Sequence, residues 1–231
     1  MLTTMAAGVH VLEAEQRFVG LELGARMTVL EVDGGLLVHA PLGVPLETLG
    51  HLGPPRWLLA PNTFHHLHVG PWIAAGCEAW AAPGLAEKRP DLAFHGVVAP
   101  GVQPFGPDVA LFPLSCFPFT NEVVVYHRPS RTLLVTDLVF NLAPTAPWLT
   151  RAAMRCAGGY PGCRTTALER GLMRREAARR EIGDLLSLDF DRLIMAHGQV
   201  IESGGRAALA RAFAWLGVPT GRLVDDGSEG A

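Results

Sequence analysis

Paired cysteines and long apolar runs are both missing from this chain. Its four cysteines form no C-x-x-C pair, so the sequence predicts neither a zinc ribbon nor a disulfide framework. No apolar run reaches the ~18 residues that a membrane-spanning helix requires. Residues 1–6 contain no basic segment followed by an apolar one, which argues against a secretory signal. We therefore expect a cytoplasmic protein with no membrane partner.

An excess of charge of one sign is also missing. The chain has 19 basic and 22 acidic residues and a formal net charge of -3. This balance gives no argument for binding a nucleic acid or an anionic membrane surface. Lysine is almost absent, and Lys88 is its only occurrence. Apolar residues nevertheless make up 49% of the chain, so we expect a globular protein with a full core.

Each of three apolar runs is followed by residues that can bind a metal. The runs and these residues are 57–60 with His65, His66 and His68, 132–136 with Asp137, and 192–196 with His197. Imidazole and carboxylate groups are common metal ligands, and loops at strand ends are where a rigid scaffold presents reactive groups. A single such residue is ordinarily a solvated loop residue, a helix cap or part of a turn. Three together predict a metal site at one edge of a sheet.

Strand-like segments come first along the chain, and helical segments dominate the second half. We expect strands over 26–32, 36–40, 56–60, 78–82, 109–114, 122–127, 132–136 and 191–196. We expect a short helix within 69–77 and longer helices over 148–157, 168–186 and 204–216. The segment 83–108 is rich in proline and glycine and reads as irregular. No linker divides the chain, so we predict one domain over 1–217 and a polar C-terminal tail over 218–231.

The order of the ligand-bearing strands resembles the metallo-β-lactamase superfamily. Within it, several segments are similar to a divergent branch, the DUF4336 family. These segments are 26–29, 37–41, 60–66, 82–85, 130–138 and 196–198. The resemblance implies an α+β fold, namely an αββα sandwich in which two sheets lie face to face with helices outside. It also implies a metal site at one edge of the sandwich.

The first motif of that superfamily, H-x-H-x-D-H, supplies ligands to two metal sites. If His65 and His66 occupy its final Asp-His pair, Pro61 and Thr63 stand where the first two histidines belong. The loop 115–121 also lacks the superfamily's middle histidine. The resemblance therefore implies that the first metal site is dismantled and the second retained. The ligands implied for the second site are His65, His66, Asp137 and His197.

A shifted alignment of the histidine loop stays open. In it, His66 and His68 form the first H-x-H, and Gly70 and Pro71 replace the Asp-His pair. A third ligand would then have to come from the loop 115–121. The candidates there are Ser115, Cys116 and Asn121. The spacing to the following glycine favours the unshifted frame.

The resemblance implies a metal-dependent hydrolase of a small ester, thioester, lactone or phosphoester. Three imidazoles and one carboxylate suit a single transition metal, with zinc first and iron or manganese as alternatives. Such an ion lowers the pKa of water and polarises a carbonyl or phosphoryl group. Asp137 would bind the metal and orient the nucleophile. Glu122 would act as an acid/base group or support a ligand from behind, or it is a surface carboxylate at the end of a strand.

A non-catalytic protein of the same fold is the alternative. Four protein ligands would close a tetrahedral zinc site and leave no position for water, as in structural sites. Catalysis would then require five-coordination or one loosely held ligand, for which His65 is the candidate. In either case the expected partner is a small-molecule substrate or ligand, and the oligomeric state is open.

Further residues near the predicted site have two interpretations each. Asn62 is a turn-former or contacts the substrate, and His68 is a solvated histidine or an alternate ligand. Cys116 is a buried, inert cysteine or a thiolate ligand. The arginine-rich segment 170–180 is a solvated helix face or recognises an anionic substrate.

Overall fold

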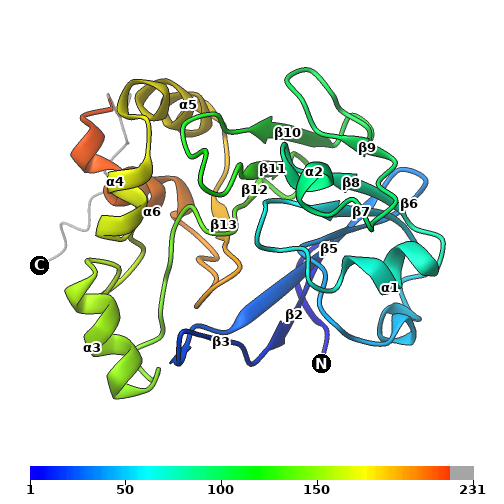
Figure 1. Ribbon diagram of the computed structural model, residues 1–231, viewed down its shortest axis with the longest axis horizontal. Helices are drawn as coiled ribbons and strands as arrows, with labels where there is room; N and C mark the ends of the chain where they lie inside the picture. Colours follow the sequence, from blue (N-terminus) through cyan, green and yellow to red (C-terminus); the bar gives the residue numbers. More distant parts are fainter. Residues whose placement is uncertain (219–231) are drawn as a thin grey trace, which may run out of the picture.

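The computed structural model describes residues 1–218, which form two β-sheets with helices on the outside (Figure 1). The larger sheet has the strand order β1-β2-β5-β6-β7-β8-β9. Its strands are β1 (Thr3–Ala6), β2 (Val9–Ala14), β5 (Ala25–Val32), β6 (Gly35–His39), β7 (Pro55–Ala60), β8 (Glu78–Ala81) and β9 (Gly96–Val97). Strands β1 to β6 pair antiparallel in this order, and β6 to β9 pair parallel.

The smaller sheet has the order β10-β11-β12-β13. Its strands are β10 (Val109–Pro113), β11 (Val123–His127), β12 (Thr132–Leu134) and β13 (Arg192–Ile194). Strands β12 and β13 are parallel, with Thr132 opposite Arg192 and Leu134 opposite Ile194. Because parallel strands end at the same edge of a sheet, the loops after β12 and β13 leave side by side. Between β2 and β5 the chain forms a short antiparallel hairpin of two strands, β3 (Arg17–Phe18) and β4 (Leu21–Glu22).

Alternation along the strands sorts apolar side chains between an inner and an outer face. In β6, Leu37 points into the core between the sheets, and Val38 points to the outer face of the larger sheet. The inner core also takes side chains from the smaller sheet, such as Val125 and Ile194. One hydrophobic core therefore joins the two sheets, as expected for a sandwich.

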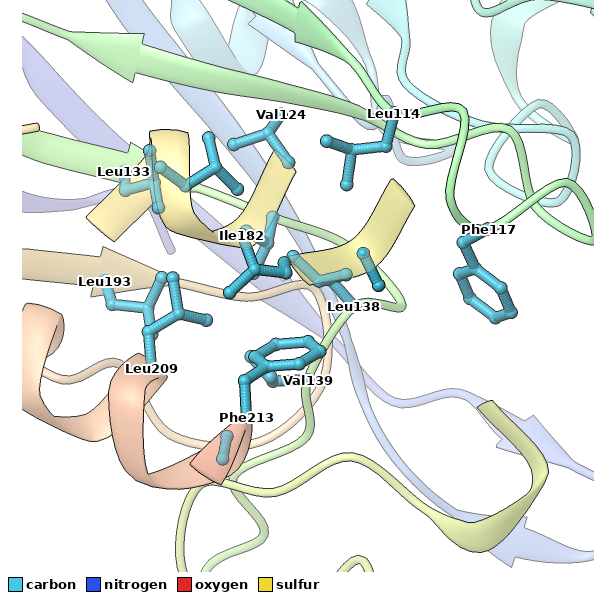
Figure 2. Close-up of a cluster of buried hydrophobic side chains, with 14 of the residues drawn as sticks. Leu114, Phe117, Val124, Leu133, Leu138, Val139, Ile182, Leu193, Leu209 and Phe213 are labelled. Atoms are coloured by element: carbon cyan, nitrogen blue, oxygen red, sulfur yellow. The ribbon is translucent and has the colours of Figure 1, made fainter. Parts of the chain in front are cut away.

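Helices cover the outer face of each sheet. The helices α1 (Val69–Ala74) and α2 (Leu85–Lys88) pack on the larger sheet through Val69, Trp72 and Leu85. The helices α5 (Arg175–Ser187) and α6 (Gly205–Ala212) pack on the smaller sheet. Figure 2 shows this second layer, where Ile182, Leu209 and Phe213 face Val124, Leu133 and Leu193. The predicted αββα sandwich and its α+β class are thereby confirmed.

Two of the predicted helices are interrupted. The segment 168–186 forms α4 (Ala167–Leu172) and α5, because Met173 adopts extended backbone and is buried in the core of the smaller sheet. The segment 204–216 forms α6 followed by a 3-10 turn, η2 (Ala214–Leu216). The helix α3 (Trp148–Cys156) lies where it was expected.

Other departures lie in segments that carry little periodicity. The segment 83–108, predicted to be irregular, contains α2 and β9, and the strands β1 to β4 were not predicted. A short 3-10 helix, η1 (Leu46–Leu49), precedes β7. Within residues 1–218, every helix is too short or too polar to cross a membrane. Apart from Val218, the predicted tail 218–231 lies outside the described residues.

Candidate metal centre

Three of the four predicted metal ligands converge at one edge of the sandwich. His65, Asp137 and His197 each offer one ligand atom, and these atoms all lie within 4.8 Å of one another. Asp137 Oδ1 lies 3.4 Å from His65 Nε2 and 3.2 Å from His197 Nε2. Donors bound tetrahedrally at roughly 2.0–2.1 Å stand about 3.3–3.4 Å apart. The donor set and its spacing therefore fit a single zinc-sized ion.

The loop after β7 presents His65 through a turn built on Asn62. The Asn62 side-chain oxygen accepts hydrogen bonds from the main-chain N–H groups of Phe64 and His65, both at 2.8 Å. The Asn62 side-chain nitrogen donates to Asp137 Oδ2 at 2.7 Å and to Thr136 Oγ1 at 2.9 Å. One buried amide therefore holds two of the ligand-bearing loops together.

The loop after β12 presents Asp137 through Glu122, the residue that precedes β11. Glu122 is fully buried, and its two carboxylate oxygens accept hydrogen bonds from the main-chain N–H groups of Thr136 and Asp137. Burial and the nearby Asp137 carboxylate raise the pKa of Glu122 to about 8. Burial alone would raise the pKa of Asp137, but His65 and His197 outweigh it and lower that pKa, so Asp137 is ionised.

The loop after β13 presents His197 through contacts with the start of β5. His197 Nδ1 donates to the carbonyl oxygen of Gly24 at 2.6 Å, and this bond turns Nε2 toward Asp137 Oδ1, 3.2 Å away. The Phe140 ring stacks on the imidazole, with ring centroids 5.7 Å apart and planes 14° apart. Although burial opposes protonation, Asp137 raises the pKa of His197. The hydrogen bond at the edge of the ring and the stacked Phe140 on its face therefore fix the orientation of the His197 imidazole.

The turn that follows β13 is clamped on both sides. On one side, the buried Arg26 guanidinium donates to the carbonyl oxygens of Met195 and Gly198 and pairs with Glu13. On the other side, Gly198 has a φ of +88°, and a Cβ atom there would lie well inside 3.0 Å of the Asn141 carbonyl oxygen. Only glycine suits this position.

The three donors lie at the surface of the sandwich and are largely buried. The side chains of His65, Asp137 and His197 are 14%, 17% and 9% exposed. Three protein donors would fill three positions of a tetrahedral ion and leave the fourth open. The geometry is thus that of an open site on the surface of the sandwich.

Comparisons with known proteins agree with this architecture. The chain matches no family model and no curated protein sequence. It is similar to solved structures of a metallo-beta-lactamase from Pontibacter korlensis (12% identity, 94% of this chain and 98% of that one, TM-score 0.65) and of one from Hirschia baltica (11%, 94% and 96%, 0.64). A third is FIM-1 from Pseudomonas aeruginosa in its mono-zinc form (11%, 95% and 96%, 0.64). The chain has the metallo-β-lactamase fold.

The fourth predicted ligand of this metallo-β-lactamase fold, His66, is not part of the converging group. His66 Nδ1 accepts a hydrogen bond from the Arg89 guanidinium at 2.8 Å, and Arg89 in turn pairs with Asp91. His65 and His66 are consecutive residues of a turn, so their side chains leave the backbone in different directions. The shifted alignment, which uses His66 and His68 as ligands, is not supported either. The His68 ring lies against Gly43 and outside the group of His65, Asp137 and His197.

The surroundings of two other predicted participants each favour one of their earlier interpretations. Glu122, predicted as an acid/base group or a support, has both oxygens engaged by main-chain N–H groups behind Asp137. This placement matches the supporting role. Cys116 is fully buried in the core of the smaller sheet, and burial and Glu181 raise its pKa. A neutral thiol in that position is a core residue.

Several residues that shape the site were not assigned to it from the sequence, although Arg26 and Gly198 lie in segments that carry the family resemblance. They are Gly24, which precedes β5, Arg26 in β5, and Phe140, Asn141 and Gly198 in the loops after β12 and β13. Asn62 was predicted to form a turn or contact the substrate, and the structure shows that it forms the turn and also binds Asp137. The sequence gives one local signal for these contacts, which is Arg26 at the start of the apolar strand β5. An arginine buried there must have polar partners.

Proposed function

We propose that the chain is a metal-dependent hydrolase with one metal ion held by His65, Asp137 and His197. The observation that carries this proposal is the convergence of three partly buried donors at zinc-like spacing, which would leave one tetrahedral position open. Zinc suits two imidazoles and one carboxylate, with iron or manganese as alternatives. That the solved structures of the same fold are metallo-beta-lactamases, one of them in a mono-zinc form, supports a single-metal hydrolase.

The residues of the chain have separable roles in such a site. A bound ion would supply a Lewis acid and lower the pKa of a water molecule. The two imidazoles would bind through Nε2, and Asp137 through Oδ1, with Oδ2 held by Asn62. The Gly24 carbonyl would keep His197 in the tautomer that leaves Nε2 free. Glu122 would hold the Asp137 main chain and take no part in proton transfer.

We propose a small ester, thioester, lactone or phosphoester as the substrate, because these have the carbonyl or phosphoryl centres that metal hydrolases attack. The relationship to the DUF4336 branch is part of the same proposal. A non-catalytic protein with a residual metal or ligand site is the second candidate. It is supported by the single donor group among the described residues, where two-metal chemistry has no second set of ligands.

Metal analysis tests the proposed site. The protein purified without chelator should contain about one transition metal per chain, measured by inductively coupled plasma mass spectrometry. His65→Ala and His197→Ala should each lose most of this metal, since both residues supply donors. His68→Ala is the matched control from the same loop and should keep it. A metal-free wild-type protein, or equal loss in His65→Ala and His68→Ala, would refute the assignment.

Turnover separates the two candidate functions. Zinc-loaded protein should hydrolyse at least one member of a panel of p-nitrophenyl acetate, p-nitrophenyl phosphate, a thioester and a lactone. Activity should disappear with a chelator and return with zinc, and His68→Ala should retain it. A protein that holds one metal per chain but turns over no member of the panel would favour the non-catalytic alternative.

A further inference from the structure

Asn62 is the most completely bonded polar side chain near the three donors. It is fully buried, and its amide makes four hydrogen bonds, which is the full capacity of an asparagine side chain. Two of these bonds hold the main chain at Phe64 and His65, and two hold Thr136 and Asp137. Such a side chain has one rotamer and transmits its position to both loops.

The two carboxylate oxygens of Asp137 have different surroundings. Oδ1 faces the imidazoles of His65 and His197, at 3.4 and 3.2 Å. Oδ2 accepts the hydrogen bond from Asn62 at 2.7 Å. The amide N–H group occupies one lone-pair direction of Oδ2 and holds this oxygen toward Asn62. The oxygen that faces both imidazoles is therefore Oδ1.

We propose that Asn62 is a positioning residue that makes Asp137 a one-oxygen ligand and so sets the site for a single ion. This inference rests on the proposed metal site. Asn62 holds His65 and Asp137 at ligand spacing while turning Oδ2 of Asp137 away from the metal. Without this bond, Asp137 can rotate and offer both oxygens to one ion, which raises the coordination number of that ion.

The decisive variant is Asn62→Ser, compared in the full chain with wild type. A serine hydroxyl can still accept the main-chain N–H bonds of the turn, but it is too short to reach Asp137. Asn62→Ala, which loses both functions, is the second variant. His68→Ala is the matched control, because His68 lies in the same loop as Asn62 and outside the group of donors.

Zinc affinity is measured by competition with a chromophoric chelator, and cobalt(II) binding by absorption spectroscopy. Asn62→Ser should bind zinc about 10–100-fold more weakly than wild type, the usual cost of losing a partner of a metal ligand. Its cobalt complex should show weaker ligand-field bands, because these bands lose intensity as the coordination number rises. His68→Ala should match wild type in both measurements.

Three outcomes separate the explanations. If Asn62→Ser and Asn62→Ala unfold more easily without metal but keep wild-type zinc affinity and cobalt bands, Asn62 is merely structural and the inference fails. If wild type binds neither metal, the proposed site fails, and the inference falls with it. Weaker binding with unchanged cobalt bands would overturn the one-oxygen role of Asp137.

Discussion

His39 provides a direct test of how the edge of the sandwich is built. It ends β6 and shares the inner face with Leu37, two residues earlier on the strand. It is only 2% exposed, and its Nε2 atom has no hydrogen-bond partner within residues 1–218. Burial, with a smaller contribution from His65, lowers the pKa of His39 from 6.5 to about 3. The folded protein therefore holds this imidazole neutral.

The sign of the pH dependence follows from this lowered pKa. The unfolded chain takes up a proton on His39 below pH 6.5, while the folded chain does not do so until about pH 3. The stability associated with neutral His39 is therefore complete above pH 6.5 and is lost as the pH falls toward 3. At pH 5, which is 1.5 units below the pKa of the unfolded chain, the loss is about 2 kcal/mol.

Urea unfolding of metal-free protein at pH 8 and pH 5 measures this loss. The free energy of unfolding of wild type should fall by about 2 kcal/mol more than that of His39→Leu between these pH values. The comparison cancels the other groups that titrate in both proteins. His51→Leu, at an exposed histidine, is the control and should behave as wild type. Equal pH dependence in His39→Leu and wild type would show that His39 is protonated or solvated in the folded chain.

Two further substitutions probe the clamp around His197. Gly198→Ala should lower the free energy of unfolding by about 2 kcal/mol or more and weaken zinc binding, since its Cβ would overlap the Asn141 carbonyl. Gly162→Ala, with a positive φ but open space around it, measures the backbone strain alone. Arg26→Met should cost about 2 kcal/mol or more, because it leaves two carbonyls unpaired. Unchanged urea midpoints would show that the turn relaxes freely.

The ligand-bearing loops could be located from the sequence because strand ends are local features. Each apolar run ends where polar residues begin, and the parallel pairing of β12 with β13 brings two of these ends together. Asp137 and His197 each lie three residues after the end of their strand, so the fold restricts where they can be placed. Asp137 and His197 therefore meet at one edge of the sheet because their strands are parallel neighbours, an arrangement that the order of strands and helices along the chain already suggested.

Which histidine turns toward Asp137 could not be predicted from spacing. His65 and His66 are neighbours, and either could replace a ligand of the motif. The choice depends on Asn62, which fixes the main chain of the turn, and on Arg89, which follows α2 and binds the His66 ring. Arg89 is more than twenty residues from His66, and no local pattern reports this contact.

The break between α4 and α5 shows both a missed signal and a real limit. Thr166 and Glu169 form a capping box, a T-x-x-E pattern that predicts a helix start at 167 from the sequence alone. The end of α4 has no comparable signal. It occurs because Met173 inserts into the core and the Arg174 N–H group donates to the Cys116 carbonyl, a tertiary contact.

The loss of His66 from the predicted ligand set changes the balance between the two candidate functions. Four protein ligands would have closed a tetrahedral ion and favoured a structural metal. With His66 bound to Arg89, the three remaining donors leave a position open, and their side chains stay partly exposed. An open position is what a hydrolytic site requires and a structural site avoids. The same contact that removes a predicted ligand therefore gives the hydrolase proposal its strongest structural support.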